Sequence, residues 1–337
     1  MTIKLVVGTY AGAGGAGLVP LAYDGVSDVW TAGEPIGHIT GASFGIVAGG
    51  QALFVDEEAG RVSLFDPGRE WHLLASCKSG GEAPCHVAVD AQGAWAAVAN
   101  YGSGSVALFG LRDGRLSGPV AHHQNEGSGP DRERQDGPHA HWVGFSRDGS
   151  RLICVDLGAD RVVSLEVDRE SGALGAPMDL YRAPPGSGPR HIAFHPRLPL
   201  AYLVSELAVT LSILHIGDGP WRVGTVLPLS RDSQTLGGAI AIDPAGNRLY
   251  ATSRGHDSIA TYALDAAGEP RLIDVVASGG ASPRHLCLTP QHLLCANEDG
   301  GTTAIFRLDE SGRPTQPQVL QVPGAASITA LPSRGTT

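Results

Sequence analysis

Apolar residues along this chain fall into short runs of about five, separated by polar, glycine-rich turns. Clear examples cover residues 95–99, 152–155 and 249–252, and a second run follows each of them at 105–109, 161–165 and 258–262. Asp-Ala-Gln-Gly at 90–93 and Asp-Pro-Ala-Gly at 243–246 have the composition of hairpin turns. Because no stretch shows helical periodicity, the pattern predicts antiparallel strands joined by hairpins.

The strand pattern recurs in units of about fifty residues, and several units open with a similar phrase around a proline. The clearest copies are Pro84-Cys85-His86, Pro138-His139-Ala140-His141, Pro189-Arg190-His191 and Pro283-Arg284-His285. Units start near residues 42, 84, 138, 189, 236 and 283. A period of roughly 40 to 50 residues made only of strands indicates a β-propeller.

A seventh unit is divided between the two ends of the chain. Residues 325–330 have the pattern of an innermost strand, and residues 3–10 have that of the strand beside it. Pairing them closes the ring and removes two exposed sheet edges. We therefore predict an all-β fold, a single seven-bladed propeller domain over residues 1–337 with four-stranded blades, in which both terminal strands complete the last blade.

Alignment of the units brings ionisable residues into two columns. The strand-start column, at the beginning of the innermost strand, contains Cys85, His141, Arg190, Gly238 and Arg284. The strand-end column, just after the second strand, contains Tyr10, Glu57, Tyr101, Leu157, Glu206, Arg254 and Glu298. Because the first two strands of a blade are antiparallel, both columns should line one mouth of the central channel.

Composition narrows the range of partners and locations. The net charge of −10 argues against a nucleic-acid or acidic-membrane surface, and no apolar run approaches the ~18 residues of a membrane span. The first segment is too short and too interrupted by glycine for a signal peptide. The five cysteines are odd in number and lack metal-binding spacing, so we expect free thiols and a cytoplasmic protein.

Several motifs, taken together and in order, resemble those of the seven-bladed lactonase family. They are Val98-Ala-Asn-Tyr101, Arg134-Gln135 before Pro138-His-Ala-His141, Asp156-Leu-Gly158, and Gly188-Pro-Arg-His191 with Ser205-Glu-Leu207. The family includes propeller-type 6-phosphogluconolactonases and carboxymuconate lactonising enzymes. The resemblance covers nearly the whole chain and implies that His141, Arg190, Glu206 and Arg254 form the active site. All four belong to the two columns.

Hydrolysis of a lactone needs a base for water, cations for the oxyanion, and an acid for the ring oxygen. His141 is the column residue whose ordinary pKa is near neutrality, which makes it the first choice as base. His139 is the alternative base, or it orients His141. Glu206 acts as a second acid–base group, or it pairs with an arginine.

Arginine is well suited to binding a phosphate or a carboxylate, so Arg190, Arg254 and Arg284 would hold the anionic group and the oxyanion. Their alternative role is in a structural ring of ion pairs with the column glutamates. Further substrate contacts are expected from Tyr101, Asn100, Glu298, His191, His285 and His139. Asn100 equally suits a turn after the strand, and His191 and His285 equally suit hydrogen bonds at strand starts.

We expect no metal or other cofactor, because the columns contain as many arginines as glutamates. The segment from His122 to Gly137 is expected to be a polar loop, either solvated or acting as a lid. The expected partner is a small anionic lactone, either 6-phosphogluconolactone or a sugar-diacid lactone, and the expected assembly is a monomer or weak homodimer. Two alternatives remain at this point: a carboxymuconate cycloisomerase, and a non-catalytic propeller that binds a ligand or a protein.

Overall fold

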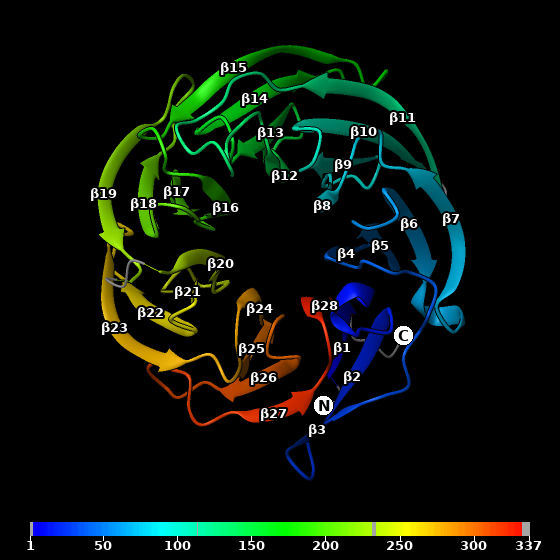
Figure 1. Ribbon diagram of the computed structural model, residues 1–337, viewed down its shortest axis with the longest axis vertical. Coiled ribbons are helices and arrows are strands. Elements are labelled where there is room, and N and C mark those ends of the chain that lie inside the picture. The colour runs from blue at the N-terminus through cyan, green and yellow to red at the C-terminus, as the bar shows by residue number, and fades with distance from the viewer. Residues whose placement is uncertain (1–2, 113, 231–233, 332–337) are drawn as a thin grey trace.

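The computed structural model describes residues 3–112, 114–230 and 234–331. Seven four-stranded antiparallel sheets stand around a central channel, as Figure 1 shows in the view along the axis. Consecutive strands of a blade are hydrogen-bonded neighbours, from the innermost strand at the channel to the outermost at the rim. The fold predicted from the sequence, an all-β propeller of seven blades, is confirmed.

The blades follow one another along the chain. The first two blades in chain order are β4 (Phe44–Ala48), β5 (Gln51–Asp56), β6 (Arg61–Asp66) and β7 (His72–Lys78), and then β8 (Pro84–Val89), β9 (Trp95–Asn100), β10 (Ser105–Arg112) and β11 (Arg115–Gln124). The third and fourth are β12 (Ala140–Phe145), β13 (Arg151–Asp156), β14 (Arg161–Val167) and β15 (Leu174–Arg182), and then β16 (Pro189–Phe194), β17 (Leu200–Ser205), β18 (Thr210–His215) and β19 (Arg222–Pro228). The fifth and sixth are β20 (Leu236–Ile242), β21 (Arg248–Arg254), β22 (Ser258–Leu264) and β23 (Pro270–Ala277), and then β24 (Pro283–Leu288), β25 (His292–Asn297), β26 (Thr302–Arg307) and β27 (Gln318–Gln321). The closing blade contains β28 (Ala325–Leu331), β1 (Ile3–Thr9), β2 (Leu18–Asp24) and β3 (Val29–Ala32), and the short 3-10 helices are η1 (Ala11–Ala13) and η2 (Pro67–Arg69).

Both chain ends contribute to the closing blade, as predicted. β28 pairs antiparallel with β1, with Val6 opposite Thr329. Two hydroxyls of β28 also reach the next blade: Oγ of Ser327 donates to the carbonyl of Ala42 at 3.0 Å, and Oγ1 of Thr329 donates to that of Gly45 at 3.0 Å. These bonds join the last strand to the following blade, so the ring is closed by main-chain pairing and by side chains.

The hairpin turns have the chemistry that the sequence predicts. Oδ1 of Asp90 accepts hydrogen bonds from the amides of Ala94 and Trp95, both at 2.7 Å. Gly93 has a φ of 67°, a left-handed conformation that glycine adopts without steric cost. Asp243 accepts from the amides of Asn247 and Arg248 in the same manner. A turn aspartate therefore fixes the hairpin between the first two strands in each of these blades.

Buried apolar side chains form a cluster between each pair of neighbouring blades in the described part of the chain. Leu108 and Val163, for example, belong to one cluster although they lie on different blades. Each blade is thus apolar on both faces, which explains why its second and third strands are nearly continuous runs of buried residues.

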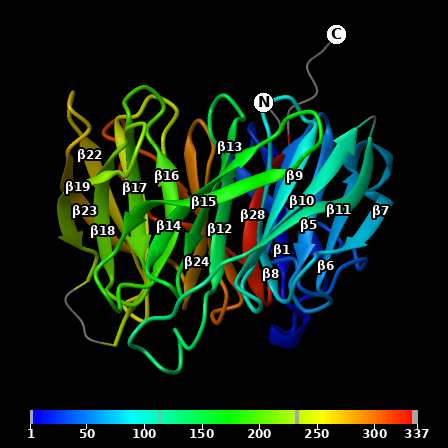
Figure 2. The same ribbon diagram turned by 90° about the horizontal axis from the view of Figure 1, so that it is seen from above.

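One segment differs from its prediction. His122 and His123 lie in β11, which continues to Gln124, and the loop begins only after this strand. Pairing of β11 with β10 extends the strand, with Val106 opposite His123. Figure 2 shows the loop between β11 and β12 on the same face of the ring as η1.

In the described residues no helix is long and apolar enough to cross a membrane.

Candidate active site

The innermost strands are irregular at the strand-start column. The pairing register shifts between Pro84 and His86, between Ala140 and Trp142, between Pro189 and His191, and between Pro283 and His285. The residues at these shifts are Cys85, His141, Arg190 and Arg284. A bulge of this kind re-aims one side chain out of the sheet. All four side chains line one small cavity at the channel mouth, together with Ser43, Phe44, His191, His285 and Ala326.

The strand-end column lies beside the strand-start column because of one recurring main-chain bond. The amide at the strand-end position donates to a carbonyl that precedes the innermost strand of the same blade. This bond runs from Glu57 to Gly41, from Tyr101 to Ala83, from Leu157 to His139, from Glu206 to Gly188 and from Glu298 to Ser282. The prediction that the two columns meet at one mouth is confirmed.

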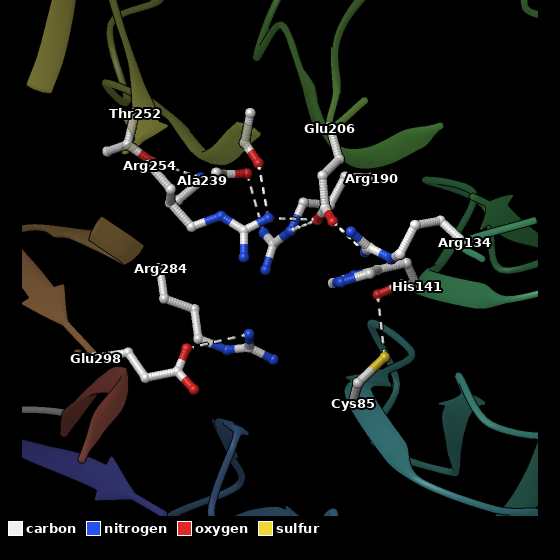
Figure 3. Close-up of polar contacts among 12 residues, drawn as sticks. Cys85, Arg134, His141, Arg190, Glu206, Ala239, Thr252, Arg254, Arg284 and Glu298 are labelled. Atoms are coloured by element: carbon white, nitrogen blue, oxygen red, sulfur yellow. Dashed lines mark hydrogen bonds and ion pairs between the residues drawn. The ribbon is translucent and has the colours of Figure 1, made fainter. Parts of the chain in front are cut away.

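Glu206 lies at the centre of an arginine cluster. Its Oε2 is 2.9 Å from Nε of Arg190 and 2.5 Å from Nη2 of Arg254, and its Oε1 is 2.5 Å from Nη2 of Arg134. Figure 3 shows the three guanidinium groups converging on this carboxylate. Arg190 also donates to the carbonyl of Gly238 at 2.9 Å, which fixes its side chain. We refer to Arg134, Arg190, Arg254 and Glu206 as the arginine cluster.

The charges in the arginine cluster are set by burial and by each other. Burial alone raises the pKa of Glu206, but Arg254 and Arg190 outweigh it and hold that pKa well below its usual range. Burial, followed by the nearby charge of Arg254, lowers the pKa of Arg190 to about 9. Glu206 is therefore ionised and Arg190 is protonated at neutral pH. Three cations and one anion leave this side of the mouth with a net charge of +2.

Arg134 is the cluster member that sequence reasoning did not place in the site. It comes from the loop after β11, where Oδ1 of Asp131 accepts hydrogen bonds from the amides of Glu133 and Arg134. The next residue, Gln135, is fully buried and donates to the carbonyl of Leu157 at 2.8 Å. The turn and this anchor together direct Arg134 into the mouth. The available signal was the Arg134-Gln135 pair, which the family resemblance included without assigning it a role.

His141 lies beside the arginine cluster and is only 6% exposed. Its ring is 5.1 Å from that of His191 and 5.6 Å from that of Tyr101. Burial, followed by the charge of Arg190, lowers the pKa of His141 well below its usual value, so the imidazole is neutral at neutral pH. Within the described residues its buried Nδ1 has no hydrogen-bond partner. This nitrogen is therefore unpaired and covered by protein atoms, while the His141 side chain as a whole lines the cavity.

His139, the alternative base, is committed to other contacts. Its ring stacks on Tyr101 with centroids 4.5 Å apart, and its Nδ1 is 2.9 Å from the carbonyl of Tyr101. Its Nε2 is 3.3 Å from Oδ1 of Asp136. Its main-chain amide donates to Asp156 at 2.9 Å. The structure therefore places His139 where it supports the loop and the Tyr101 ring beside His141.

His285 and the equivalent His86 accept hydrogen bonds between blades, whereas His191 packs against other rings. Nδ1 of His285 accepts from the amide of Ile328 at 3.2 Å, and Nδ1 of His86 accepts from the amide of Val143 at 3.4 Å. Each bond ties an innermost strand to that of the next blade. His191 packs between His141 and His86, with ring centroids 5.1 and 5.7 Å away. His191 and His285 also line the cavity.

Asn100 does not reach the mouth. Its side chain is fully buried, and Nδ2 lies 3.4 Å from both the carbonyl of Ser79 and Oγ of Ser105. It therefore joins the end of β9 to the neighbouring turn. Tyr101 does reach the mouth, since its ring contacts that of His141.

Arg284 lies across the cavity from the arginine cluster (Figure 3). Its Nη1 is 3.3 Å from Oε2 of Glu298, and its Nη2 donates to the hydroxyl of Tyr10 at 2.8 Å. The same Nη2 is 3.7 Å from Oε2 of Glu57, which accepts from the Tyr10 hydroxyl at 2.5 Å. We refer to Tyr10, Glu57, Arg284 and Glu298 as the tyrosine cluster. In the described residues no group of three or more His, Cys, Asp or Glu is arranged to hold a metal ion.

A family model described as lactonase, 7-bladed beta-propeller, matches residues 4–329. The chain belongs to this family. The 6-phosphogluconolactonase of Bacillus subtilis (strain 168) is 34% identical over 291 residues, covering 82% of this chain and 78% of that protein. Family membership confirms the resemblance that the repeated motifs indicate.

Solved structures of similar proteins share the whole ring. A putative 6-phosphogluconolactonase from Bacteroides fragilis NCTC 9343 has a TM-score of 0.89 at 26% identity, over 98% of both chains. A periplasmic gluconolactonase from Pseudomonas aeruginosa has a TM-score of 0.90 at 26% identity, over 98% of this chain and 99% of that one. The lactonase-family propeller is therefore preserved from end to end in this chain.

Proposed function

We propose that this protein hydrolyses the lactone of an acidic sugar, with 6-phosphogluconolactone as the leading substrate and sugar-diacid lactones next. The observation that carries the proposal is the arginine cluster beside a neutral, buried His141, with Arg190 of the cluster and His141 lining one cavity. The cluster supplies the cations that an anionic group requires, and His141 supplies a proton acceptor. The names of the similar proteins support the choice of a lactone.

In the proposed mechanism, His141 accepts a proton from water as the water oxygen attacks the lactone carbonyl carbon. Arg190, which lines the same cavity as His141, stabilises the resulting oxyanion. When the bond from the carbonyl carbon to the ring oxygen breaks, the His141 imidazolium returns its proton to that oxygen. The product is the open-chain hydroxy acid, and the neutral histidine is restored.

Glu206 supports this reaction as an ionised group. Its pKa lies well below the usual range, so it does not donate a proton at neutral pH. Its negative charge raises the pKa of His141, against burial and Arg190, which both lower that pKa. Glu206 therefore orients the three guanidinium groups and stabilises the imidazolium that forms during water attack.

A hydrolysis assay with a pH indicator at pH 6.5 tests this function over a panel of lactones. The panel contains 6-phosphogluconolactone, gluconolactone, glucarolactone, galactarolactone and muconolactones, each with and without a chelator. Hydrolysis far above the spontaneous rate, selective for an acidic lactone and unchanged by chelator, is expected. Absence of hydrolysis across the panel would contradict the proposal and favour the cycloisomerase or the binding propeller. Cytoplasmic location and a monomer or weak homodimer remain predictions.

A further inference from the structure

The channel mouth has two chemically different sides. The arginine cluster contributes three cations and one anion, a net charge of +2. The tyrosine cluster contributes one cation, Arg284, and two anions, Glu57 and Glu298, a net charge of −1. Arg190 and Arg284 line the same small cavity, so a ligand seated over this cavity would lie between the two sides. A ligand is therefore expected to place its negatively charged end at the arginine cluster and an uncharged end at the tyrosine cluster.

In the tyrosine cluster the cation is already neutralised. Two of the five N–H donors of Arg284 bond to Glu298 and Tyr10, and its guanidinium lies over the Tyr10 ring at 5.2 Å. Tyr10, Glu298 and Glu57 raise the pKa of Arg284 although burial, the largest effect, lowers it. A second anionic group of a ligand would have to approach two carboxylates that share this single cation.

The carboxylates of the tyrosine cluster are accessible and retain capacity as acceptors. The side chains of Glu57 and Glu298 are 23% and 22% exposed, whereas that of Glu206 is 3% exposed. Within the described ranges, no hydrogen bond or ion pair involves Oε1 of Glu57 or of Glu298. Ionised carboxylates accept strong hydrogen bonds from hydroxyl groups. This side is therefore suited to neutral hydroxyls and unsuited to anions.

We propose that Tyr10, Glu57, Arg284 and Glu298 form a hydroxyl-binding subsite, which orients a ligand with its anionic group at the arginine cluster. The ligand class is a polyhydroxylated ring with an anion at one end only. Muconolactones, which lack hydroxyls, are disfavoured, as is any lactone that carries a second anion at the end remote from the arginine cluster. This inference rests on the proposed function, because it takes the ligand to be an acidic lactone.

Calorimetric titration at pH 7 tests the subsite without requiring turnover. The two probes are 1,5-anhydroglucitol 6-phosphate, which has one anionic end, and 6-phosphogluconate, which has a carboxylate at the other end as well. The wild-type protein is expected to bind the first at least tenfold more tightly. Glu57→Gln and Glu298→Gln are each expected to narrow this ratio at least threefold, because each removes one negative charge from the subsite.

Glu58→Gln is the matched control. Glu58 is the next residue after Glu57, is exposed, and accepts a hydrogen bond from the amide of Gly12 at 3.2 Å outside the cavity. An unchanged ratio in this variant is expected. A wild-type ratio below threefold, binding of neither probe, or the same change in all three variants would overturn the inference. If the protein hydrolyses no lactone, the proposed function fails, while the affinity ratio still decides the subsite.

Discussion

Nη2 of Arg134 lies 2.5 Å from Oε1 of Glu206, although 72 residues separate the two in the chain. The contact joins the loop between β11 and β12 to the end of β17 across the channel mouth. Arg134 is 35% exposed in its side chain, whereas Arg190 is 1% exposed. Of the three guanidinium groups around Glu206, the one on the loop is therefore the most accessible to a ligand that enters from solvent.

Removal of Arg134 is expected to weaken binding of an anionic lactone. A hydrogen bond to a charged group contributes about 1.5–3 kcal/mol, so Arg134→Ala should raise KM for 6-phosphogluconolactone by roughly ten- to a hundredfold. Neutral gluconolactone should be affected less than threefold, and steady-state kinetics on both substrates measures the difference. Arg132→Ala, an exposed arginine in the same loop, is the control. An equal effect on both lactones would contradict an anion-binding role.

Glu206 is expected to be important for stability. Glu206→Ala leaves Arg134, Arg190 and Arg254 without their shared anion, and loss of one partner from a buried ion pair costs about 3–5 kcal/mol. Urea unfolding should report a decrease of this size in the free energy of unfolding. Glu133→Ala, an exposed glutamate in the Arg134 loop, should change it by less than about 0.5 kcal/mol. A loss below about 1 kcal/mol for Glu206→Ala would show that the cluster contributes little to folding.

The pH dependence of kcat/KM should show the lowered pKa of His141. The base must be neutral, and burial followed by Arg190 lowers its pKa well below 6.5. Catalysis should therefore persist below pH 6.5 and decline only at more acidic pH, with the midpoint of the acid limb well below pH 6.5. Initial rates corrected for spontaneous hydrolysis provide the profile. A midpoint at or above pH 6.5 would exclude His141, in its present environment, as the base.

His285 should make folding stability dependent on pH. Burial, followed by Arg190 and Arg284, lowers its pKa to about 4. Between pH 4 and 6.5 the unfolded chain binds the proton that the folded protein excludes, so stability decreases as pH falls through this window, by up to about 3 kcal/mol. His285→Gln should show a shallower decrease in urea titrations at a series of pH values. The exposed His122→Gln control should follow the wild type, and identical slopes in all three proteins would refute this origin of the pH dependence.

The repeat explains how much of the site the sequence could predict. Cys85, His141, Arg190 and Arg284 occupy equivalent positions in their units, so one alignment places all four at one mouth. The β-bulges that turn these side chains into the cavity depend on pairing geometry, which apolar periodicity does not reveal. Arg134 has no equivalent in other units, so no column could locate it.

Residues that are adjacent in sequence at a strand end can differ in whether their side chains reach the channel mouth. Asn100 and Tyr101 are adjacent, yet Asn100 is fully buried against Ser105 while Tyr101 reaches the mouth. Alternation of side chains explains this separation once the register is known. The sequence also could not predict which glutamate pairs with which arginine, because the pairing depends on the distances between side chains of different blades. Glu206 binds three arginines, and Glu298 shares Arg284 with Glu57 and Tyr10.

Comparison of His141→Ala with His139→Ala tests the central claim most directly, by the rate of 6-phosphogluconolactone hydrolysis with the fold verified by thermal unfolding. Both histidines come from the same short phrase, but only His141 faces the cavity, while His139 stacks on Tyr101. General-base catalysis contributes about 10²–10⁴-fold, so kcat/KM should fall at least a hundredfold for His141→Ala and less than tenfold for His139→Ala. Near-wild-type turnover by His141→Ala, or an equal loss in both variants, would contradict the account.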